Sequence, residues 1–167
     1  RQTQHMTSHL QIPYTPFGHY SELSPDDQAL VLAALNATRL SYAPYSGFRV
    51  GAAVSTTGGR ILEGANQENA SFSLTICAER TVLGIYASLD TDETITAMAI
   101  AYTADQVDPK ALLSPCGACR QHILEYQNRQ EAPFRILMTA PDGSGIEVAS
   151  IRELLPFAFT GAELPKP

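Results

Sequence analysis

The chain has 167 residues, 44% of them hydrophobic, which suits a single domain with its own apolar core. Eleven Lys and Arg stand against 17 Asp and Glu, and this net charge of −6 argues against nucleic acid as a partner. No stretch approaches the roughly 20 apolar residues that cross a bilayer, and three cysteines are too few to staple a secreted scaffold, so we expect a soluble cytoplasmic protein with reduced thiols and no membrane partner.

The N-terminal part of the chain divides into two segments. Residues 1–22 are mostly polar, broken by prolines and without periodicity, so they predict a loosely ordered extension before a single domain over residues 23–167. The run Ser24-Pro25-Asp26-Asp27 combines an N-cap residue, a proline for the first helical position and two acids for the positive end of the helix dipole. It predicts a helix of about four turns that ends near Tyr42.

The remaining elements alternate strands and helices. Gly58-Gly59 predicts a two-residue turn between antiparallel strands at 48–57 and 60–68. Periodicity then predicts a helix at 76–89, a central strand at 94–102, a helix at 116–129, strands at 134–140 and 146–149, and a short helix that Ser150 caps. This order predicts an α/β fold with a mixed sheet of five strands covered by helices.

The three cysteines fall at two predicted helix starts. Cys116 and Cys119 are spaced i and i+3, so both sulfurs face the same side of a helix and can reach one ion. A third ligand is needed, and Cys77 is the only other thiol. Three thiolates on Zn²⁺ leave the fourth tetrahedral position for water, which is the arrangement of a catalytic site. Arg80 and Arg120, adjacent to the ligands, are candidates to hydrogen-bond the sulfurs and offset their negative charge.

Other readings of these motifs stay open at this level. A lone Cys-x-x-Cys is also a redox motif, and a lone cysteine is usually a small core residue. Glu79, two residues after Cys77, is either a surface acid near a helix start or a carboxylate that faces a metal-bound water. The occurrence of Cys-Ala-Glu together with Pro-Cys-x-x-Cys favours the second reading.

This pairing resembles the signature of the zinc deaminases that act on cytosine. The resemblance extends to the three-cysteine nucleoside cytidine deaminases through YAPYSGFRVGAA at 42–53, NQEN at 66–69, CAER at 77–80, SPCGACRQ at 114–121 and ELLPFAF at 153–159. It covers roughly residues 25–160. It implies a three-layer α/β/α fold, one Zn²⁺ per chain and a homotetramer.

The resemblance also implies roles for individual residues. Glu79 would shuttle a proton from the zinc-bound water to N3 of cytosine and then to the departing ammonia. Asn66 and Glu68 would bind the ribose 3′-hydroxyl, Phe48 would pack on the pyrimidine and the Ala78 backbone would help to fix the base. Phe72, where many relatives have tyrosine, and Phe159 match positions that reach into a neighbouring subunit's site. Gln121 would join Arg80 and Arg120 around the ligands.

These features together predict a zinc hydrolase of pyrimidine salvage that converts cytidine and 2′-deoxycytidine into the uridine nucleosides with release of ammonia. One alternative is a deaminase of another cytosine nucleoside, such as a blasticidin-type antibiotic. Another is a binding protein with a structural zinc, in which Glu79 would have no reason to lie beside the cysteines. From the residues alone, NQEN can equally be an ordinary polar loop, and an aromatic such as Phe48 can be plain core.

Overall fold

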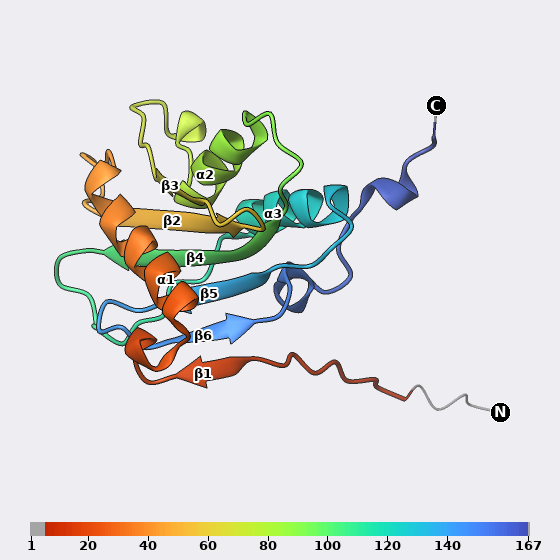
Figure 1. Ribbon diagram of the computed structural model, residues 1–167, viewed down its shortest axis with the longest axis horizontal. Helices are drawn as coiled ribbons and strands as arrows, with labels where there is room; N and C mark the ends of the chain where they lie inside the picture. The colour runs from red at the N-terminus through yellow and green to blue at the C-terminus, as the bar shows by residue number, and fades with distance from the viewer. Residues whose placement is uncertain (1–5, 167) are drawn as a thin grey trace.

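A computed structural model describes residues 6–166 of the chain. Within this range one mixed sheet contains six strands in the order β1-β6-β5-β4-β2-β3 (Figure 1). The strands are β1 (Thr15–Phe17), β2 (Arg49–Thr56), β3 (Ile61–Ala65), β4 (Ile95–Thr103), β5 (Arg135–Thr139) and β6 (Gly145–Val148). The helices are α1 (Pro25–Ala37), α2 (Ala78–Ala87) and α3 (Gly117–Arg129). Strands β4 and β5 are parallel and the other pairs antiparallel.

The predicted α/β class and mixed sheet are confirmed, but the prediction of five strands is wrong by one. The sixth strand, β1, lies in the segment that the sequence predicts to be loosely ordered, and it pairs with β6 through Thr15 and Glu147. Residues 1–5 of that predicted extension lie outside the described residues. A three-residue segment with a proline in the middle shows no alternation of apolar and polar residues that would predict a strand. Strand β1 forms because it pairs with β6.

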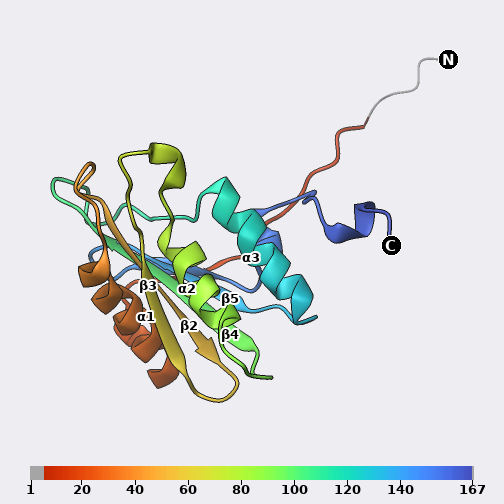
Figure 2. The same cartoon turned by 90° about the horizontal axis from the view of Figure 1, so that it is seen from above.

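Helices cover both faces of the sheet, with α1 on one side and α2 and α3 on the other (Figure 2). The alternation along β4 determines this arrangement. Met98 and Ile100 contribute to the core under α2 and α3, whereas Ala97, Ala99 and Ala101 face α1. Small side chains on the second face allow α1 to lie close to the sheet.

Gly51 shows how close this approach is. A Cβ at this position would stand 2.0 Å from the carbonyl oxygen of Ala34 on α1. Any larger residue in the middle of β2 would therefore push the helix from the sheet. Because β2 and α1 flank residues 38–48, their contact fixes where that connecting segment enters the site described below.

Element ends differ from the sequence prediction by a few residues. The α-helical part of α1 ends at Ala37 and continues as a 3-10 turn, Thr38–Leu40. The β2-β3 turn spans residues 57–60, with Gly59 at φ 83°, instead of two glycines alone. Strand β3 ends at Ala65, so Asn66 and Glu68 leave the sheet. No helix within residues 6–166 has the length and apolar character required to traverse a membrane.

Candidate active site

The three thiols meet where the N-termini of α2 and α3 converge. Cys77 is the N-cap residue of α2, Cys116 is the N-cap residue of α3, and Cys119 follows in the first turn of α3. The Sγ atoms of Cys77 and Cys116 are 4.0 Å apart, and all three sulfurs lie within 4.8 Å of one another. Two helix dipoles thus direct their positive ends at the thiols.

The geometry of the cluster fits a zinc ion. Tetrahedral Zn²⁺ with Zn–S bonds of about 2.3 Å separates its sulfur ligands by roughly 3.8 Å. The Cys77–Cys116 separation of 4.0 Å is close to this value, no sulfur separation exceeds 4.8 Å, and the set of three soft donors is one that zinc accepts. We therefore assign Cys77, Cys116 and Cys119 as the residues that fit one Zn²⁺ per chain.

The pKa values of the Cys77 and Cys119 thiols are shifted in opposite directions. Hydrogen bonds from Cys119 and Cys116, with the charge of Arg80, lower the pKa of Cys77 to about 6, although burial opposes this. The hydrogen bond to Cys77 and then burial raise the pKa of Cys119. Cys77 therefore becomes the thiolate that a metal requires more readily than Cys119 does.

Glu79 lies beside this cluster and is 4% exposed. It occupies the first turn of α2, on a face that turns inward because Ala78, Val82 and Leu83 on the same helix are buried. Burial raises the pKa of its carboxyl group to about 7, and the nearby Cys77 contributes to this rise. A surface acid would not be buried in this way, so that reading of Glu79 is wrong.

A cavity of about 370 Å³ connects the thiols with the predicted sugar-binding residues. Its size suits a small organic molecule. The residues that line it are Ser46, Phe48, Val50, Asn66, Glu68, Thr75, Cys77, Ala78, Glu79, Leu113, Ser114 and Cys116. The predicted Phe48, Asn66, Glu68 and Ala78 are thus in one cavity with Glu79 and two of the thiols, although they come from segments up to 68 positions apart.

Phe48 forms part of the cavity wall and is backed by a second ring. It stacks on Tyr102 of β4, with ring centroids 5.0 Å apart and an angle of 24° between the planes. The Tyr102 hydroxyl donates a hydrogen bond to the carbonyl oxygen of Ala111 at 2.6 Å. This anchors the position of Tyr102, and Tyr102 supports the face of Phe48 that does not line the cavity.

Asn66 is held from three sides. Its Oδ1 accepts hydrogen bonds from the Ser41 hydroxyl (2.5 Å) and the backbone N–H of Val50 (2.8 Å), and its Nδ2 donates to the carbonyl oxygen of Phe48 (2.9 Å). These bonds join three chain segments at the cavity wall. Asn66 therefore organises the wall in addition to lining it, which the N-x-E pattern does not reveal.

Glu68 is held by the turn that precedes Phe48. One carboxylate oxygen accepts from the backbone N–H of Tyr45 at 2.8 Å, and the other accepts from the hydroxyl of Ser46. The Ser46 bond is the main reason that the pKa of Glu68 is lowered. Sequence reasoning missed Ser46 as a lining residue, because a serine in a polar turn carries no signal of its own.

The surrounding residues only partly match their predicted roles. Arg80 lies close enough to Cys77 for its charge to favour the thiolate. Arg120 donates instead to the Pro115 carbonyl (2.8 Å), the Leu154 carbonyl (2.8 Å) and the Ser114 hydroxyl (3.0 Å), so these bonds hold the loop that leads to Cys116 and do not reach a sulfur. Gln121 donates from Nε2 to the Phe159 carbonyl at 3.0 Å.

Two predicted residues do not line the cavity of this chain. Phe72 is 74% exposed and meets Tyr45 edge to face at 5.8 Å, and Phe159 is 59% exposed. Both aromatic side chains lie on the outer surface.

Comparison with known protein families decides what this arrangement is. Residues 24–132 match the family model of the cytidine and deoxycytidylate deaminase zinc-binding region. The chain belongs to this deaminase family. The matched residues include all three cysteines and Glu79.

Individual members of the family are similar over most of the chain. A cytidine deaminase from Halalkalibacterium halodurans is 40% identical over 140 residues, which cover 83% of this chain and 98% of that protein. The crystal structure of cytidine deaminase from Burkholderia pseudomallei superposes with a TM-score of 0.65 at 38% identity, covering 78% of this chain and 97% of the other. That of Mycobacterium tuberculosis gives a TM-score of 0.62 at 34% identity, covering 82% and 99%.

Proposed function

We propose that this chain catalyses the hydrolytic deamination of cytidine and 2′-deoxycytidine to uridine and 2′-deoxyuridine with release of ammonia, as a step of pyrimidine salvage. The observation that carries the proposal is the single cavity that unites a zinc-compatible thiol cluster, the buried Glu79 and the polar residues Asn66 and Glu68. The sequence relatives are themselves cytidine deaminases, so a blasticidin-type substrate or a structural-zinc protein is not favoured.

The chemistry requires a carboxyl group beside the reacting carbon. When bound, zinc supplies Lewis-acid activation of the attacking water. Glu79 takes one proton from that water and delivers it to ring N3 so that C4 accepts the hydroxyl group. It then takes the second proton, from this hydroxyl group, and passes it to the exocyclic nitrogen, so that the C4–N bond breaks, the C4 carbonyl forms and ammonia leaves as a neutral molecule. Its burial excludes bulk water, so the carboxyl group exchanges protons with the substrate.

The other residues of the cavity position the nucleoside. Phe48, braced by Tyr102, provides an apolar face for the pyrimidine ring, and the backbone at Ala78 adjoins the base next to Glu79. Asn66 and Glu68 lie farther along the same cavity and supply polar atoms for the 3′-hydroxyl. Glu68 is fixed by Ser46 and Tyr45, so it presents its free lone pairs in a defined direction.

We also propose a homotetramer in which Phe72 and Phe159 complete a neighbouring subunit's site. The support is that both rings are exposed in one chain although they are large and apolar. Three free thiols support a reducing location such as the cytoplasm.

Glu79→Gln tests the mechanism, because it keeps the size of the side chain but cannot carry a proton. We expect kcat for cytidine, followed by its ultraviolet change, to fall by about 10²–10⁴-fold or more, with zinc content and fold unchanged. Glu125→Gln, at an exposed position of α3, is the matched control and retains activity. A Glu79→Gln protein that keeps its zinc and full activity contradicts the mechanism, and one that loses its zinc makes Glu79 a ligand.

A further inference from the structure

Thr75 lines the cavity but takes no part in the proposed reaction. It follows the 3-10 turn Phe72–Leu74 and precedes Cys77 by two residues. It lies between the NQEN and CAER motifs and belongs to neither. Its side chain is half-buried, so its hydroxyl group can meet a molecule in the cavity. The neighbours of Thr75 in the structure indicate what this hydroxyl group binds.

The backbone places Thr75 beside Glu68. Gln67 and Ile76 form an isolated antiparallel bridge, in which the N–H of each donates to the carbonyl oxygen of the other at 2.9 and 3.0 Å. The residues on either side of such a pair stand opposite each other, so Thr75 faces Glu68 with about 5 Å between the Cβ atoms. Side chains alternate between the two faces of an extended chain. Accordingly, the neighbours of the bridge line the cavity, whereas the two bridge residues do not.

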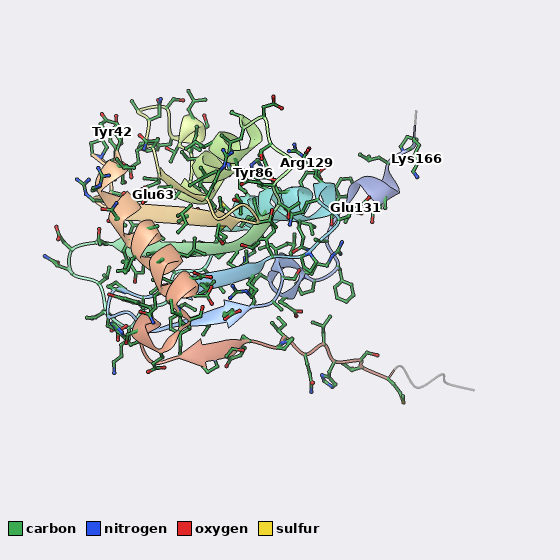
Figure 3. All side chains as sticks on the ribbon, viewed as in Figure 1. Tyr42, Glu63, Tyr86, Arg129, Glu131 and Lys166 are labelled. Atoms are coloured by element: carbon green, nitrogen blue, oxygen red, sulfur yellow. The ribbon has the colours of Figure 1, made fainter. Side chains whose placement is uncertain are left out.

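The segment that carries Glu68 is also held on its other side. Gln67 forms a parallel bridge with Tyr42, which is labelled in Figure 3, and the carbonyl oxygen of Tyr42 accepts from the N–H of Glu68 at 2.8 Å. The carboxylate of Glu68 is fixed in turn by residues 45 and 46. Glu68 and Thr75 therefore present a carboxylate and a hydroxyl group at a preorganised spacing.

Three side-chain hydroxyl groups line the cavity, and two of them are bonded within the chain. The Ser46 hydroxyl donates to a carboxylate. The Ser114 hydroxyl accepts from Arg120 at 3.0 Å and donates to the Met138 sulfur at 3.5 Å. In the part of the chain that the structure describes, the third hydroxyl, that of Thr75, has no hydrogen-bond partner. It therefore keeps its donor and its lone pairs for a ligand.

These two side chains complement two neighbouring hydroxyl groups of a ribose. The pKa of Glu68 is lowered, mainly by the hydrogen bond from Ser46, so its carboxylate only accepts and suits the 3′-hydroxyl as donor. The 2′-hydroxyl lies on the adjacent ring carbon and on the same face of the sugar, whereas the 5′-hydroxyl lies on the other face. Thr75 belongs to the segment that continues to Cys77, where the base reacts, and C2′ is the ring carbon between the 3′-hydroxyl and the base. A hydroxyl group at Thr75 therefore meets the 2′-hydroxyl.

We propose that Thr75 is a specificity-determining residue that hydrogen-bonds the 2′-hydroxyl of cytidine, so that the chain uses cytidine more efficiently than 2′-deoxycytidine. This inference rests on the proposed function and deepens it, because it ranks the two proposed substrates. The 2′-hydroxyl is remote from the reacting C4 atom and its bond to Thr75 is the same before and during the reaction. Its loss should therefore raise KM for cytidine and leave kcat nearly unchanged.

Steady-state kinetics of the zinc-loaded protein with cytidine and with 2′-deoxycytidine test the proposal. Thr75→Val keeps the shape of the side chain and removes its hydroxyl group. We expect kcat/KM for cytidine to fall by about three- to tenfold, mainly through KM, and kcat/KM for 2′-deoxycytidine to stay close to the wild-type value. Thr75→Ser retains a hydroxyl group and should keep most of the preference. Thr103→Val, the same change at an exposed position of β4, is the matched control and should alter neither value.

The ratio of the two kcat/KM values separates this inference from the proposed function. A wild type that deaminates neither nucleoside overturns the proposed function and this inference with it. A wild type that prefers 2′-deoxycytidine, or an unchanged ratio in Thr75→Val, including an equal fall for both nucleosides, overturns the assignment of Thr75 alone. If Thr75→Ser loses the preference as fully as Thr75→Val, packing of the methyl group sets the preference and the assignment is again overturned.

Discussion

At the scale of single residues, the two members of the N-x-E pair differ in what they hold. Asn66 is buried and bonds to Ser41, Phe48 and Val50, whereas Glu68 bonds to the exposed turn at residues 45 and 46. Removing Asn66 leaves buried polar groups unpaired, but the partners of Glu68 can turn to water. Substitution of Asn66 should therefore affect mainly stability, and substitution of Glu68 mainly substrate binding.

We expect Asn66→Ala to lower the free energy of unfolding by about 1–3 kcal/mol. Glu68→Ala should leave stability nearly unchanged while reducing kcat/KM for cytidine. Thermal unfolding and steady-state kinetics with cytidine and 3′-deoxycytidine measure the two effects. If the wild type uses both nucleosides equally well, or Glu68→Ala retains the wild-type preference for cytidine, Glu68 does not read the 3′-hydroxyl.

Arg120 holds the loop before Cys116 through three hydrogen bonds. Its guanidinium group bonds two carbonyl oxygens and the Ser114 hydroxyl, a set that a lysine ammonium cannot reach from one position. Arg120→Lys keeps the charge but should loosen the loop before Cys116 and weaken zinc affinity by about tenfold, measured by competition with a chelator. Arg129→Lys, which removes a guanidinium over the Tyr126 ring, is the control. Unchanged zinc affinity in Arg120→Lys would mean that these three hydrogen bonds are not needed to position the loop before Cys116.

At the scale of elements, one ion-pair network ties α1 to the sheet. Asp27 in the first turn of α1 accepts two hydrogen bonds from Arg135 of β5, at 2.9 and 2.8 Å, and Arg135 also donates to Glu147 of β6 at 3.1 Å. The bond from Arg135 lowers the pKa of Asp27 below its ordinary value of 3.8. Because the folded pKa is the lower one, the stabilisation is present above pH 3.8 and is lost as pH falls through the folded value.

We expect Asp27→Asn to lower the free energy of unfolding by about 1 kcal/mol at pH 7, since the pair is bidentate but partly exposed. The difference from wild type should shrink as the pH is lowered below about 4. Denaturant unfolding at pH 7 and pH 3 measures it, with Asp26→Asn as the neighbouring control. A difference that is independent of pH would mean that the Asp27 charge contributes nothing.

At the scale of the whole molecule, the thiol cluster joins the N-termini of two helices and so couples metal binding to stability. Removing zinc by chelation should lower the unfolding temperature by roughly 10 °C, because a ligand at about 100 times its dissociation constant stabilises by about 3 kcal/mol. Calorimetry with zinc counted per chain measures this. Cys116→Ala should respond little to the chelator, and an unchanged unfolding temperature in the wild type would contradict the coupling.

The sequence by itself predicted all the main elements except β1, and it predicted the candidate reactive groups. Periodicity of two and 3.6 residues, the cap at Ser24 and the spacing of Cys116 and Cys119 are local signals, and they predicted α1 to α3, β2 to β6 and the zinc ligands. Motifs such as CAER and SPCGACRQ predicted Glu79 as the proton carrier, because proton transfer and metal binding need particular residue types at short spacing.

Only the tertiary structure decided which contacts each side chain makes. Strand β1 exists because β6 offers an edge, which no pattern in three residues predicts. Arg120 bonds carbonyl oxygens instead of sulfur, and Ser46 and Tyr102 support Glu68 and Phe48, because packing brings distant segments together. The local sequence sets the secondary-structure propensity of each segment. Contacts between distant segments depend on how the loops run and how the whole core packs.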